Sequence, residues 1–200
     1  MNTPQQVKRI QVSKLFEKVL KNERYSFKPS AIQISESLDQ EGTLCSFSYK
    51  SVVENHTEEV LISEVQGNGF VDCIFSGLKD KYQNDFNSLE NIRLLNLSVR
   101  PNFNYKKDSL GTSAQVEVGL KLEIKSSDYA EFYHCSNSLV NSGLTAALEA
   151  FEFYINCENC FYKLKRALRD AESRNRFDTV ERCLIGLSSI TEFNRYAKKT

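Results

Sequence analysis

The 200-residue sequence is poor in the residue types that catalysis and membrane insertion need. It holds only two histidines, so acid–base chemistry by histidine is thinly supplied. No run of about 18 apolar residues is present, which argues against a transmembrane helix, and the first twenty residues lack the apolar segment of a signal peptide. We therefore expect a cytoplasmic protein without a membrane partner.

Net charge is also lacking, because Lys+Arg and Asp+Glu both number 26. Non-specific nucleic-acid binding needs a basic field. We therefore expect no nucleic-acid partner.

The six cysteines lack the spacing of a metal site. Cys157 and Cys160 form a C-x-x-C pair, but no second pair follows at zinc-finger spacing. His134 and Cys135 are adjacent on an expected strand, so their side chains point to opposite faces. Because zinc needs three or four convergent ligands, we expect no metal, no cofactor, and reduced thiols packed between helices.

The chain contains a pattern that occurs twice. Residues 31–84 and 89–156 each predict three strands followed by a helix, with strands that show period-two alternation and helices that show a 3.6-residue apolar stripe. The clearest strand is AQVEVGLKLEI, in which every second residue is apolar. The predicted fold is α+β, with two pseudo-symmetric strand–strand–strand–helix units and antiparallel sheets.

Helices are expected at both ends of this core. Residues 5–22 carry an amphipathic stripe, the helix from about residue 143 continues to about 172, and DTVE at 178–181 resembles a capping box that opens a last helix. The expected organisation is an N-terminal helix extension (1–30), the core (31–156) and a C-terminal helical extension (157–200).

The stretch GNGFVDCIFSGL, residues 67–78, places a Gly-Asn-Gly turn directly before an apolar helix. No lysine follows the glycines as in a P-loop, and position 72 is Asp where a dinucleotide fingerprint has its third glycine. Two interpretations stay open. The glycines supply backbone angles at a corner, or the free amides of a helix N-terminus bind an anion such as a small carboxylate.

Four stretches together resemble the regulatory domain of 2-isopropylmalate synthase and citramalate synthase. They are VQGNGFVDCIFSGL, LLNLSVRPNFN, SAQVEVGLKLEI and YHCSNSLVNSGLTAALEAFEFYIN. The resemblance covers residues 31–156 and implies a C-terminal allosteric and dimerisation module, in which leucine or isoleucine binds between the two units near the helix N-termini. The catalytic TIM barrel of those enzymes has no room in 200 residues, so we expect a non-enzymatic chain that is either free-standing or truncated, and the first residue, Met1, favours the free-standing one.

The resemblance implies an effector pocket around the two helix starts. Its residues would be Gly67, Asn68, Gly69, Phe70, Val71, Leu97, Ala114, Ser138, Ser142 and Leu144. Several of these depart from the family pattern, in which proline stands at Phe70, Asp-Tyr at Asn96-Leu97, Asp-Ala at Ser113-Ala114, and Gly and Asp at Ser138 and Ser142.

Two functions follow from these observations. The first is a non-catalytic regulatory module that binds a branched-chain amino acid or related carboxylate, dimerises, and regulates a partner synthase catalytic subunit in trans. The alternative is a degenerate dimerisation or protein-interaction module without a ligand. A pocket between the helix starts, lined by Val71, Leu97 and Ala114, would favour the first, and a filled space would favour the second.

A homodimer is expected under either function. The strands of the two units are expected to carry apolar residues such as Leu95 and Phe132 on surfaces that one helix layer does not cover.

Overall fold

The computed structural model describes residues 4–37, 39, 42–102, 115–125, 128–194 and 196. This part of the chain holds four α-helices and two short 3₁₀ helices. The helices are α1 (Pro4–Val19), α2 (Phe70–Tyr82), α3 (Leu139–Ser173) and α4 (Phe177–Thr191), with η1 (Lys21–Glu23) and η2 (Asn87–Asn91). None of the helices in the described ranges is long and apolar enough to cross a membrane.

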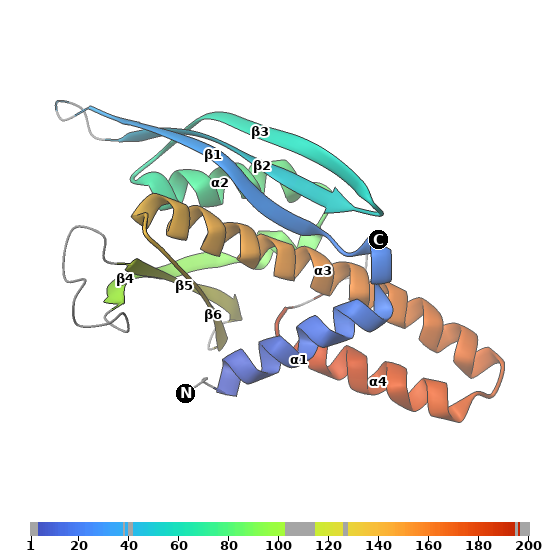
Figure 1. Cartoon of the computed structure of the whole chain (residues 1–200). Coiled ribbons are helices and arrows are strands. Elements are labelled where there is room, and N and C mark those ends of the chain that lie inside the picture. The colour runs from blue at the N-terminus through green and yellow to red at the C-terminus, as the bar shows by residue number, and fades with distance from the viewer. Residues whose placement is uncertain are drawn as a thin grey trace.

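In the described ranges, six strands form two separate antiparallel sheets of three strands each. The first sheet pairs β1 (Ser26–Glu36), β2 (Thr43–Val53) and β3 (His56–Gly67) in that order. The second pairs β4 (Arg93–Asn102), β5 (Gln115–Lys125) and β6 (Asp128–Ser136) in that order. The first sheet is followed by α2 and the second by α3, so the two predicted strand–strand–strand–helix units are present and the α+β fold class is confirmed (Figure 1).

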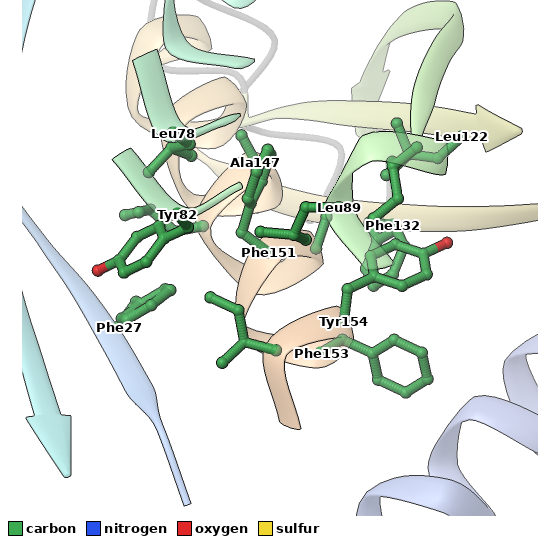
Figure 2. Packing of buried hydrophobic residues seen from close by; sticks show 14 of the residues in the cluster. Phe27, Leu78, Tyr82, Leu89, Leu122, Phe132, Ala147, Phe151, Phe153 and Tyr154 are labelled. Atoms are coloured by element: carbon green, nitrogen blue, oxygen red, sulfur yellow. The ribbon is translucent and has the colours of Figure 1, made fainter. Parts of the chain in front are cut away.

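The long helix α3 lies between the two sheets. It packs against β5 and β6 of its own unit, against β1 of the first unit, and against α2 (Figure 1). Phe151 meets Phe75 of α2 with ring centroids 5.1 Å apart, and Tyr154 meets Phe132 of β6 at 5.9 Å. Figure 2 shows Phe151 directed toward α2 and Tyr154 lying beside Phe132. One helix therefore joins both units into one hydrophobic core.

The terminal helices cover the second half of α3. Phe153 on α3 contacts Phe16 of α1 at 5.5 Å and Phe193, just after α4, at 5.1 Å between ring centroids. The backbone of α4 comes close at Gly186, where an added Cβ would lie 2.9 Å from a methyl group of Leu164. The two extensions that flank the core in sequence are thus packed on it through α3.

Several sequence boundaries differ from expectation. The strand expected near Ala31 begins at Ser26, because an edge strand tolerates Pro29, where the β1–β2 register shifts. Helix α3 starts at Leu139 rather than near residue 143, since Ser138 caps it. The capping box expected at Asp178 is wrong: Arg176 is the N-cap of α4 and makes no side-chain cap bond.

Phe132 was expected on an uncovered surface and is instead buried under α3 and α1. The guanidinium of Arg9 lies 4.5 Å from the centre of its ring. The expectation failed because β6 is covered by two helices, α3 and α1, and not by α3 alone. Leu95, by contrast, is exposed.

Asn156 ends the AFEFYIN segment and ties the N-terminal extension to α3. Its side-chain oxygen accepts the Tyr25 amide at 2.9 Å, and its side-chain nitrogen donates to the Tyr25 carbonyl at 2.9 Å. This pair of bonds aligns the chain just before β1.

We predict that Asn156→Ala destabilises the fold by about 1–3 kcal/mol, because two backbone groups of Tyr25 lose their buried partner. The half-buried Asn159, three residues further along α3, is the control, and Asn159→Ala should change stability by less than about 0.5 kcal/mol. Urea denaturation of both variants measures the difference. Equal midpoints would show that the Tyr25 contact contributes nothing.

Candidate functional site

The Gly-Asn-Gly corner joins β3 to α2. Gly67 is the last residue of β3, and Gly69 is the N-cap of α2 with φ 177° and ψ 165°. Gly69 is therefore in extended backbone, a conformation that any residue can adopt. The first interpretation of the turn thus fails at Gly69.

The anion at the start of α2 comes from the protein itself. The Asp72 carboxylate Oδ2 accepts the amide of Asn68 at 3.1 Å. A carboxylate in the first helical turn is stabilised by the positive end of the helix dipole and by unpaired amides. The position considered for an effector carboxylate therefore already has an internal negative charge beside it.

The two glycines have different roles. A Cβ on Gly67 would lie 2.8 Å from Asp72 Oδ2 and 3.0 Å from both the amide nitrogen and the sulfur of Cys73. A Cβ on Gly69 would have no atom within 4 Å. Gly67 thus permits the turn to close on the first turn of α2, and Gly69 carries no such constraint.

The start of α3 is also satisfied from within. The Ser138 hydroxyl accepts the Asn141 amide at 3.3 Å as the N-cap. The buried Ser142 hydroxyl donates to the Val116 carbonyl at 2.9 Å and shares a 2.9 Å hydrogen bond with Ser136. Of the two hydroxyls expected to recognise a ligand, that of Ser138 therefore caps α3, and that of Ser142 holds α3 to β5 and β6.

The two helix starts meet directly. An added Cβ at Gly143 would lie 2.7 Å from the Phe70 ring and 3.6 Å from a methyl group of Val71. Leu144, the next residue, is buried. The structure therefore brings Phe70 and Val71 against the α3 start, and the Phe70 ring occupies the space beside Gly143.

The remaining site residues lie elsewhere. Leu97 is on β4, paired with Leu120, and 40% of its surface is exposed. Ala114 is outside the described residues. Of the nine expected residues that the structure describes, Gly67 and Asn68 line a cavity of about 570 Å³, which lies at the end of the first sheet beside Thr43 and Gln66.

The cysteines make no metal centre in the described part of the chain, where no group of three metal-binding side chains comes together. None of the six is in a disulfide. Cys157 and Cys160 are buried on α3, as the packing interpretation predicted. Burial raises the pKa of both thiols, that of Cys160 to about 12, which disfavours the reactive thiolate.

A charged cluster that the sequence reading missed lies between α1, β1 and α3. Glu152 accepts the Phe27 amide at 2.9 Å and lies 3.3 Å from Arg24. Burial raises the pKa of Glu152, although the Phe27 amide and Arg24 act in the opposite direction. A cavity of about 190 Å³ adjoins these groups.

Arg9 belongs to the same cluster. It donates to the Glu131 carbonyl at 2.7 Å, and burial lowers its pKa. The signal in the sequence was the polar series Glu149, Glu152 and Asn156, which interrupts the apolar stripe at one side of α3. Through these bonds, Arg24 and the Phe27 amide fasten the N-terminal segment to α3, and Arg9 fastens it to β6.

A scan against protein-family models found no match to this chain, and a search of curated proteins found none.

The corner allows a paired test of the glycine roles. Gly67→Ala should destabilise the fold by about 1–3 kcal/mol, because the new methyl group overlaps Asp72 and the Cys73 backbone. Gly69→Ala should be neutral or stabilise it by about 0.4–1 kcal/mol, because alanine restricts the unfolded chain. Thermal unfolding measures both. If Gly69→Ala is the more damaging variant, our assignment of the two glycines is reversed.

Proposed function

We propose that this chain is a non-catalytic dimerisation module with the two-unit fold of a regulatory domain, and that β4 pairs with β4 of a second copy. The observation that supports it is the open face of β4. Leu97 and Val99 are 40% and 51% exposed, although their strand partners Leu120 and Val118 on the same face are buried.

The exposure follows from unequal helices. In the first unit β1 is covered by α3, the helix of the other unit. The equivalent cover for β4 would come from α2, but α2 has 13 residues where α3 has 35. Within the described chain, no helix packs across β4.

The other sheet edges suit self-pairing less well. The edge strand β3 carries exposed Glu58, Glu59 and Glu64, which would oppose like charges across a twofold axis. On β6, the Glu131 carbonyl already accepts Arg9. In β1, Pro29 lies at the register shift, whereas Pro101 of β4 is next to the last residue of its strand. β4 has no acidic residue.

The β4 sequence fits its own antiparallel copy. With a twofold axis at Ser98, Leu97 faces Val99 of the second copy twice, and Asn96 faces Arg100. No like charges are then directly opposite, and the apolar pairs stabilise the added ladder. The paired sheets would form one six-stranded sheet, a closed symmetric assembly.

We predict that the protein has about twice its chain mass of 22.9 kDa at tens of micromolar. Leu97→Lys should weaken the dimer at least roughly tenfold, because each lysine then faces Val99 of the other copy in place of an apolar partner, and the two lysines are diagonal neighbours across the axis. Leu61→Lys is the control, since Leu61 is 71% exposed on β3 of the other sheet. Sedimentation velocity measures all three proteins. A single-chain mass for the wild type, or equal effects of both substitutions, would contradict the proposal.

Effector binding is the second candidate function, with a branched-chain amino acid or related carboxylate as ligand and a synthase catalytic subunit as the partner regulated in trans. The 570 Å³ cavity beside Gly67 and Asn68 favours it, because that volume is typical of small-molecule sites. Both candidates agree with a cytoplasmic chain whose thiols stay reduced.

A thermal-shift screen of the twenty amino acids and common keto acids tests the second candidate. If a carboxylate binds at this corner, Gly69→Asp should weaken it roughly thirtyfold, about 2 kcal/mol, through charge repulsion. The open space at Gly69 lets the variant fold, which circular dichroism checks. Binding that Gly69→Asp leaves unchanged would place the ligand away from the corner, and a screen without a ligand would remove this candidate.

A further inference from the structure

A groove runs between α1 and α4, on the opposite end of the molecule from β4 (Figure 1). Its volume is about 490 Å³. The floor is apolar and consists of Val12, Leu15, Gly186 and Phe193. One wall carries Ile185, a large apolar side chain that is 61% exposed.

The rim of the groove is basic, although the whole chain has no net charge. The lining holds Lys8, Lys14, Lys18 and Arg182, against a single acidic residue, Glu192. Lys8 and Glu192 pair at 2.7 Å. No ion pair joins Lys14 or Lys18 to another described residue. Lys14 and Lys18 therefore line an apolar channel without an ion-pair partner among the described residues, and Arg182, whose Nε donates to the Asp178 carbonyl, adds a third positive charge from α4.

The shape of the groove narrows the choice of occupant. On α1 the lining extends from Lys8 to Lys18, which at 1.5 Å per residue is about 15 Å, or three helical turns. Lys14 and Lys18 lie one turn apart on α1, and Arg182 lies on α4. Cations spread along both walls match several carboxylates distributed on a chain, whereas one small carboxylate would need converging cations.

We infer that this groove binds an acidic amphipathic helix of a partner protein, with the apolar side of that helix on the groove floor and its carboxylates toward Lys14, Lys18 and Arg182. Helix-in-groove recognition takes apolar anchors at positions i, i+3 or i+4, and i+7, which three turns supply. Complementary charge sets the orientation and speeds association. The inference is independent of the β4 dimer, because the two surfaces share no residue.

Fluorescence anisotropy with two labelled synthetic helices of about 15 residues tests this inference, the length being set by the groove. One helix has leucine anchors with glutamate flanks, and the other has lysine in place of each glutamate. The acidic helix should bind and weaken with added salt, and the basic helix should not bind. Equal binding of both, or binding of neither, would overturn the inference.

Neighbouring residues on α4 give the matched variants. Ile185→Glu should weaken the acidic helix at least roughly tenfold, because it places a carboxylate in an apolar contact. Leu184→Glu should leave binding unchanged, because Leu184 is 51% exposed but does not line the groove. Equal effects of the two substitutions would place binding elsewhere and overturn the inference.

A second pair of variants, which changes charge on α1, tests the same inference if Ile185→Glu fails to fold. Lys14→Glu with Lys18→Glu should abolish the preference for the acidic helix. Arg166→Glu with Arg169→Glu makes the same change in net charge at exposed positions of α3, and this variant should keep the preference for the acidic helix.

Displacement of the acidic helix by oleate at equal concentration would indicate a fatty-acid site instead. Loss of dimer mass in Ile185→Glu would indicate a second copy. Either result would overturn the inference.

Discussion

The structure depends on the packing of α3, which has to bury its surface against two sheets at once. From Ser142 to Cys160 most of its side chains are buried, and those that are not, Thr145, Glu149, Glu152 and Asn159, lie along one side of the helix. A helix with so wide an apolar surface is stable only when it is enclosed. The first sheet, α2 and the second sheet enclose its first half, and α1 and α4 enclose the rest. The two units cannot be separated without exposing this helix.

The same helix explains the asymmetry between the units. A 35-residue helix covers both its own sheet and β1, and it leaves a second half that needs cover from the terminal helices. A 13-residue helix covers only β2 and β3. The exposed face of β4 and the groove between α1 and α4 are thus consequences of unequal helix length in a fold that repeats itself.

Polar residues on α3 set the register of the segments packed on it. Asn156 holds the Tyr25 backbone, Glu152 holds the Phe27 amide, and Glu158 accepts the Ser88 amide at 2.9 Å. Removing one partner of such a buried hydrogen bond leaves the other polar group without a partner or water. The loss in folding free energy is then larger than the net contribution of the bond. These residues therefore fix where β1 and η2 lie.

The fold followed from the sequence because periodicity reports which face of an element is buried. The alternation in β5 and the stripe of α2 were sufficient for the two units. The site was less predictable, because the spacing of residues in the sequence does not show which other residues a side chain contacts. Asp72 turns back to Asn68, and Phe70 packs on Gly143, 73 positions further along the chain. The polar series on α3 was visible, but its partners near Tyr25 could not be assigned without the three-dimensional arrangement.

Residues that differ from the regulatory-domain pattern make contacts within the chain at the two helix starts. Phe70 occupies the space beside Gly143, and Ser138 and Ser142 bond within the chain. Leu97 lies on the open edge strand. These four residues are consistent with a module that assembles through β4, and they leave the cavity beside Gly67 as the place where a small carboxylate could still bind.

Amide hydrogen exchange of residues 93–100 tests the proposed assembly most directly when it is measured at protein concentrations below and above the dissociation constant of the dimer. Pairing of β4 with its copy gives its outward amides hydrogen-bond partners, so exchange in this segment should slow markedly at high concentration while β3 is unchanged. Exchange in β4 that is independent of concentration, with protection arising in β3 or in α4 instead, would contradict the account.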